Sequence, residues 1–83
     1  MVYSFLHIGR FPWERDDSYE GEVFVVQVAR VESMRNTRAF FVHLHNWLCA
    51  NVEDFRMENG GQYVRTYSLP DPAEAAIFKL TFG

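Results

Sequence analysis

The most regular hydrophobic pattern in the chain runs from Asn36 to Val52, where apolar residues recur with a helical period. At about 100° per residue these positions fall on one face of a helix. The positions on that face are Thr37, Phe40, Phe41, Leu44, Trp47, Leu48 and Val52. Ser33 and Asn36 precede or open this stretch, and both residue types cap helix N-termini. The pattern predicts an amphipathic helix from about Met34 to Ala50.

Two earlier stretches have the composition of β-strands. Val2 to Ile8 is rich in β-branched and aromatic residues, and Val23 to Ala29 is almost continuously apolar. A continuously apolar strand is covered on both faces, so we place Val23–Ala29 centrally in a sheet. The polar stretch between them, Arg10 to Glu22, contains Pro12 and is predicted to be a loop.

The stretch from Asp54 to Leu69 predicts a β-hairpin. Phe55 and Met57 alternate with polar residues on one side of Asn59-Gly60-Gly61, and alternation resumes after it. Asn and Gly accept the positive φ angles that tight hairpin turns require.

The C-terminal stretch opens with a helix start signal, because Asp71 can cap, Pro72 suits the first helical position and Glu74 can close a capping box. We predict a short helix from Pro72 to Ile77. Phe78, Leu80 and Phe82 then alternate with polar residues, which favours a final strand over a longer helix.

These elements run β-β-α-β-β-α-β along the chain. The sequence therefore predicts one α+β domain spanning residues 1–83, with an antiparallel sheet and two helices on one face. Without its first strand the order is βαββαβ, so we expect a ferredoxin-like arrangement with an extra N-terminal strand.

Residues 67–82, which end in EAAIFKLTF, resemble the C-terminal tails of small uncharacterised tailed-phage proteins. Those tails combine an aromatic strand, an acidic turn, a short Ala-containing helix and FKL followed by an aromatic residue. The resemblance covers the last part of the chain and implies a viral origin, with the host cell cytoplasm as the location. It carries no catalytic residues.

Composition agrees with a dense small core, since 48% of the 83 residues are hydrophobic and 17% aromatic. A net charge of −3 argues against a protein that binds duplex nucleic acid. One cysteine, Cys49, excludes an intrachain disulfide framework. No signal peptide and no apolar run of about 18 residues is seen, so we expect a cytoplasmic protein without a membrane segment.

Few residues suggest a catalytic or metal-binding role. His45 and Cys49 are four apart on one side of the predicted helix, a spacing that could supply two zinc ligands or a thiolate and its base. A surface pair is the simpler interpretation, because further ligands or activating groups would have to come from elsewhere. No phosphate-binding loop is present. We therefore predict a non-enzymatic protein with no metal and no cofactor.

The candidate contact residues are aromatic and charged. Trp13 and Tyr19 lie among Glu14, Asp16, Asp17 and further acids, which suits an aromatic anchor inside an acidic rim. The alternative is a solvated connector whose aromatics fold back on the core. The hypothesis is a protein-binding module, a phage-encoded inhibitor of a host or defence protein, that uses Trp13, Asp16, Asp17, Tyr19, Arg65 and Tyr67.

Two other functions stay open. Tyr63, Arg65 and Tyr67 interleave aromatics with a cation, as in sheets that stack single-stranded bases. Core packing of these tyrosines is the simpler interpretation, and the acidic balance makes nucleic acid the less favoured partner. An open edge at Val2–Ile8 or at the predicted hairpin would instead favour a homodimer or larger assembly.

Overall fold

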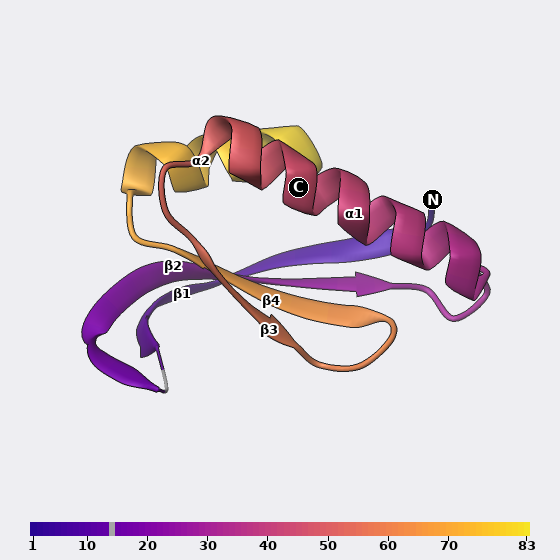
Figure 1. Cartoon of the computed structure of the whole chain (residues 1–83), viewed down its shortest axis with the longest axis horizontal. Coiled ribbons are helices and arrows are strands. Elements are labelled where there is room, and N and C mark those ends of the chain that lie inside the picture. Colours follow the sequence, from indigo (N-terminus) through magenta and orange to yellow (C-terminus); the bar gives the residue numbers. More distant parts are fainter. Residues whose placement is uncertain (14) are drawn as a thin grey trace.

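The computed structural model describes residues 1–13 and 15–83, and the predicted rim residue Glu14 lies outside the described residues. The elements in chain order are β1 (Tyr3–Trp13), β2 (Asp16–Val28), α1 (Met34–Asn51), β3 (Arg56–Asn59), β4 (Val64–Leu69) and α2 (Pro72–Phe82). The strands form one antiparallel sheet in the order β1-β2-β4-β3, and both helices cover the same face of it (Figure 1). The predicted α+β class and the placement of both helices on one face are confirmed.

The connection from β2 through α1 to β3 is a split β-α-β unit. Both strands pair antiparallel with β4, which lies between them, so β2 and β3 run parallel to each other. The other side of β2 is occupied by β1, and α2 follows β4 with no strand after it in the described residues. The predicted order βαββαβ, with its ferredoxin-like arrangement, is therefore not found.

The core lies between the sheet and the helices. The predicted central strand is confirmed, because β2 lies between β1 and β4 and turns Phe24, Val26 and Val28 toward the helices. The predicted helix is also confirmed, with Ser33 as its cap: the Ser33 Oγ accepts a hydrogen bond from the Asn36 N–H. The buried positions of α1 are those of its apolar face, namely Thr37, Phe41, Leu44 and Leu48.

The predicted final strand over Phe78–Phe82 is wrong, because α2 continues to Phe82. Four-residue spacing places Phe78 and Phe82 on the same helix face, and both rings are buried against Trp47 of α1. In a strand, Leu80 would share the face of these two rings, whereas in the helix it points to solvent. Burial of two aromatic rings outweighs the strand preference of Phe and Thr.

The predicted loop over Arg10–Glu22 is also wrong, because β1 extends to Trp13 and β2 begins at Asp16. Polar residues in this stretch form cross-strand pairs rather than a solvated connector. Arg10 opposes Glu22, and its guanidinium lies 3.4 Å from the Glu20 carboxylate and 4.0 Å from that of Glu22. Opposite charges that face each other across antiparallel strands stabilise the pairing.

The second hairpin and the second helix start are confirmed in outline. Gly61 has φ of 122°, and the Asn59 Oδ1 accepts a hydrogen bond from its N–H in the turn between β3 and β4. Asp71 caps α2 by accepting hydrogen bonds from the N–H groups of Ala73 and Glu74. The Glu74 carboxylate, however, accepts from the Glu53 N–H at 3.0 Å, so it joins the two helices at their neighbouring ends.

Candidate functional site

The end of the β1–β2 hairpin bends away from the helices and reaches below the sheet (Figure 1). The register between the strands shifts between His7 and Gly9 and again between Pro12 and Trp13. Gly9 has φ of 122°, a left-handed conformation that glycine adopts without strain. Shifts of this kind bend a strand and increase its twist, so they account for the curvature of the hairpin.

Tyr19 fastens the bent hairpin to the strands on the other side of β2. Its side chain is 8% exposed, and its hydroxyl donates a hydrogen bond to the Ser68 carbonyl oxygen at 2.8 Å. The Arg56 guanidinium lies over its ring, 4.0 Å from the centroid, and the Trp13 ring meets it edge-on. Burial raises the pKa of the Tyr19 phenol. One side chain therefore joins β2 to both β3 and β4.

Asp16 completes this attachment. Its carboxylate accepts hydrogen bonds from the Ser18 Oγ at 2.6 Å and from Arg56 Nη2 at 2.8 Å. These hydrogen bonds lower the pKa of the Asp16 carboxyl, and the bond from Ser18 has the largest effect. The Asp16 carboxylate therefore interacts within the protein and positions Arg56 over the Tyr19 ring.

The sheet face that the helices leave uncovered carries large apolar side chains. Leu6, Ile8 and Phe11 of β1 are 58%, 50% and 46% exposed. The bent hairpin and this face enclose a hollow of about 450 Å³, which we call the sheet hollow. Its walls include Ile8, Phe11, Trp13, Val23, Val25 and Glu58.

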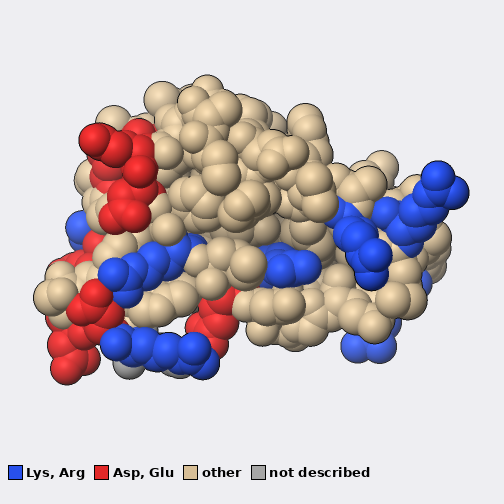
Figure 2. Space-filling view, viewed as in Figure 1, with Lys and Arg blue, Asp and Glu red and all other residues tan. Residues whose placement is uncertain are grey.

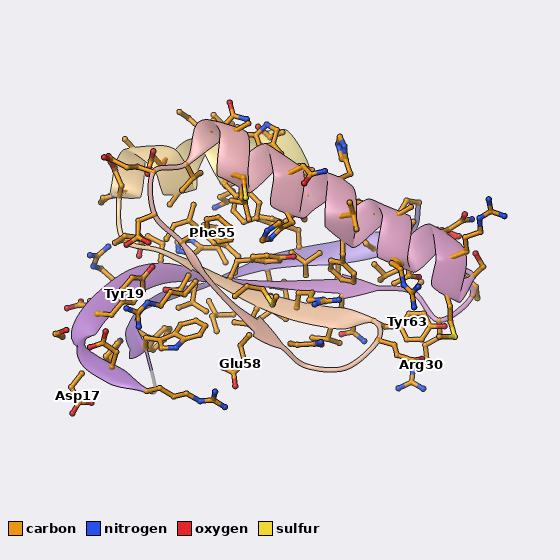
Figure 3. The ribbon with its side chains drawn as sticks, viewed as in Figure 1. Asp17, Tyr19, Arg30, Phe55, Glu58 and Tyr63 are labelled. Carbon is orange, nitrogen blue, oxygen red and sulfur yellow. The ribbon has the colours of Figure 1, made fainter. Side chains whose placement is uncertain are left out.

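One acidic residue lines the sheet hollow, and another lies at the end of the hairpin. Glu58 of β3 points from the sheet away from the helices, and Asp17 projects from the hairpin end (Figure 3). On the face that Figure 2 shows, acidic side chains gather at this end of the molecule together with several Lys or Arg side chains, whereas the opposite end shows Lys and Arg alone. Among the described residues that line the sheet hollow, Glu58 is the charged one, so the hollow is an apolar surface with one negative charge in its wall.

The structure places the four hairpin candidates differently from one another. Trp13 is half-buried in the wall of the sheet hollow, and Asp17 is exposed at the hairpin end. Asp16 and Tyr19 are engaged within the protein. For Tyr19 this is the alternative drawn from the sequence, in which an aromatic residue folds back on the core.

The two candidates on β4 face the helices. Tyr67 is 1% exposed and packs against Phe78, and burial raises the pKa of its phenol to about 12. Arg65 stacks over the Phe41 ring of α1, with 5.0 Å between guanidinium carbon and centroid. These two side chains therefore lie away from the sheet hollow, and the sheet presents no open platform of Tyr67 and Arg65 for bases.

Sequence reasoning did not identify Leu6, Ile8 and Phe11 as surface residues. The available signal was an N-terminal strand with apolar residues on both faces: Tyr3 and Phe5 face the helices, and Leu6 faces the other way. Such a strand at the edge of a sheet with helices on one face leaves one apolar row uncovered.

The His45 and Cys49 pair lies on the exposed side of α1. The His45 ring meets Phe55 edge-on, and the Cys49 thiol is exposed. Within residues 1–13 and 15–83, no three His, Cys, Asp or Glu side chains come close enough together to hold a metal ion. In the same residues, neither helix is long and apolar enough to cross a membrane.

Comparison with known proteins gives no match of the chain to a family model, to a curated protein or to a solved structure.

Proposed function

We propose that this protein is a non-enzymatic binding module that holds an apolar, positively charged segment of another protein in the sheet hollow. The observation that carries the proposal is the row of exposed apolar side chains at Leu6, Ile8 and Phe11 on the uncovered sheet face. Contiguous exposed apolar surface of this kind marks interaction sites in small proteins.

The shape of the sheet hollow is set before any partner arrives. Tyr19, Arg56 and Asp16 hold the bent hairpin by two hydrogen bonds and a ring contact, so the wall that includes Trp13 is fixed. A preformed wall lowers the conformational entropy that binding would cost. Trp and other aromatic residues in such positions supply much of the binding free energy at protein interfaces.

The charge in its wall favours one kind of segment. Glu58 lines the sheet hollow, Asp17 is exposed at the end of the hairpin, and neither forms an ion pair with the described residues. A segment with Lys or Arg beside its apolar residues would compensate these charges, whereas an acidic segment would be repelled.

The resemblance of residues 67–82 to tails of small tailed-phage proteins supports a narrower proposal, a phage-encoded inhibitor that covers a functional surface of a host or defence protein. In the fold these residues form β4 and α2, and their side chains Tyr67, Phe78 and Phe82 are buried. The tail thus supports the domain, and the contact surface is proposed elsewhere, on β1 and the bent hairpin.

Two labelled peptides test the proposal, each with leucine at alternate positions and either lysine or glutamate between. We expect the lysine peptide to bind about tenfold more tightly than the glutamate peptide in fluorescence anisotropy titrations. Ile8→Asp places a charge in the sheet hollow and should weaken lysine-peptide binding about tenfold or more. Leu80→Asp is the matched control, because Leu80 is 85% exposed on α2.

Equal affinity for the two peptides, or equal effects of the two substitutions, would contradict the proposal. Light scattering on the free protein tests whether a second copy of the chain occupies the sheet hollow. A dimer that Ile8→Asp dissociates and Leu80→Asp does not would assign the sheet hollow to self-association and overturn binding of another protein.

A further inference from the structure

A second cavity lies on the helix side of the sheet, between the first half of α1 and the turn that joins β3 to β4. It has a volume of about 340 Å³, and a smaller cavity of about 190 Å³ adjoins it along α1. Both are lined by Arg38, Phe41 and Arg65, so they form one depression, which we call the arginine groove. Met34 and Tyr63 form further walls of its larger part.

Arg65 enters this groove with its hydrogen-bonding capacity almost unused. Its Nε is buried and has no hydrogen-bond partner within the described residues. Its Nη1 reaches the Met57 sulfur at 3.9 Å, and thioether sulfur is a weak acceptor. A guanidinium carries five N–H donors, and those of Arg65 meet no carboxylate within 4.0 Å in the described chain.

Other positive groups add to the charge of the groove. Arg38 projects into it from α1 and forms no ion pair with a described residue. Arg30 lies near the Tyr63 ring, with 5.9 Å from guanidinium carbon to centroid, at the same end of the molecule (Figure 3). The first turn of α1 begins beside the groove and contains no acidic residue to offset its positive helix end.

An uncompensated pair of arginines in a groove with aromatic walls is suited to a particular ligand chemistry. A phosphate monoester carries about −1.5 to −2 charges and three acceptor oxygens, so it can engage both guanidiniums. A carboxylate brings one charge. Tyr63 and Met34 supply apolar surface for the organic part of the ligand, whereas the Phe41 ring is 4% exposed and lies beneath Arg65. The cavity lies at the lower end of the volumes of small-molecule sites, about 300–1,000 Å³.

We infer that the arginine groove binds a small phosphate monoester, with the phosphate between Arg38 and Arg65 and a ring against Tyr63 and Met34. This inference is independent of the proposed function, because the sheet hollow lies on the opposite face of the sheet. Substitutions in one surface should leave the other unchanged. The two proposals can therefore be tested separately, and one can fail without the other.

Isothermal titration at low ionic strength with phenyl phosphate, inorganic phosphate and benzoate tests the inference. We expect phenyl phosphate to bind with a dissociation constant on the order of 1 mM, and the other two more weakly. Inorganic phosphate lacks the ring and benzoate lacks the second charge. Phenyl phosphate affinity no greater than that of benzoate would assign the groove to carboxylates, and no saturable binding would remove it as a site. Either result overturns the inference.

Three arginine substitutions separate a specific site from general attraction to positive charge. Arg38→Gln and Arg65→Gln should each weaken phenyl phosphate binding about tenfold or more. Arg35→Gln removes the same charge from an exposed neighbouring position that does not line the groove, and it should leave the affinity within about twofold. Equal losses in all three variants would contradict a built site.

Because Arg65 also packs on Phe41, a change there could disturb the fold. Arg65→Lys keeps a charge and much of the packing but removes the planar fork, so it should weaken binding with an unchanged circular dichroism spectrum. Full retention of affinity in this variant and in Arg38→Gln would overturn the assignment of these two residues.

Discussion

Replacing Tyr19 with alanine tests whether this side chain fastens the bent β1–β2 hairpin to the rest of the sheet. The change removes a ring that is 8% exposed, a hydrogen bond to the Ser68 carbonyl and the stacking surface for Arg56. A buried aromatic ring removes about 150–250 Å² from water, at about 25 cal/mol per Å². This area corresponds to about 4–6 kcal/mol as an upper bound, because the unfolded chain already buries part of it and alanine keeps the Cβ. With the hydrogen bond included, we expect the free energy of unfolding to fall by about 3–5 kcal/mol, as for other buried aromatic residues cut back to alanine.

Two further variants divide this loss. Tyr19→Phe removes the hydroxyl and keeps the ring, so it should cost about 1 kcal/mol. Trp13→Ala removes a half-buried ring at the border of the sheet hollow and should cost about 1–2 kcal/mol, less than Tyr19→Ala. Urea denaturation followed by circular dichroism measures all three. The domain as a whole has about 4–12 kcal/mol to lose, so each variant must first be shown to fold.

The order of the three losses in stability shows which of the two rings holds the hairpin. If Tyr19→Ala costs under about 1 kcal/mol, the hairpin is not held by this ring, and the sheet hollow has no fixed wall. If Trp13→Ala costs as much as Tyr19→Ala, Trp13 belongs to the core and is not available as an anchor for a partner.

Two other predictions concern positions near β4. Gly21→Ala should lower the free energy of unfolding by about 1–3 kcal/mol in the same urea experiment, because a Cβ there would collide with the buried Ser68 Oγ and lie 3.1 Å from the Leu69 backbone; an unchanged midpoint would contradict this packing. Above pH 10, stability should fall, because the pKa of Tyr67 is about 12 in the folded protein against 10.0 when unperturbed, so its contribution is complete below pH 10 and is lost as pH rises through 12. Thermal denaturation across this range should show a smaller decline for Tyr67→Phe.

Elements whose local signals agree with their packing could be predicted from the sequence. The period of α1, its Ser33 cap and the Gly61 turn all act through residues close together in the chain. The last turn of α2 could not, because its strand-favouring residues become helical through contact of Phe78 with Trp47, which lies far away in the sequence.

The bent hairpin was missed for a related reason. Its charged residues have the composition of a solvated loop, and their pairing becomes visible when Arg10 is placed opposite Glu22. Composition also does not predict that Arg56, from another strand, would bind the Asp16 carboxylate and lie over the Tyr19 ring. The candidate residues in the hairpin could be named from the sequence. Which of them the fold would leave exposed could not be predicted, because that depends on contacts with another strand.

Alternation along β1 separates the residues that carry the fold from those that carry the proposed binding. Phe5 faces the helices and packs on Phe24 and Phe78, whereas the neighbouring Leu6 lies opposite Val25 on the uncovered face. A polar substitution at Leu6 removes little buried surface, because that side chain is already more than half exposed. The same substitution at Phe5 would open the aromatic cluster beside Phe78. A polar substitution on the uncovered side of β1 should therefore leave the core intact, so a loss of peptide affinity in such a variant would report on the surface and not on folding.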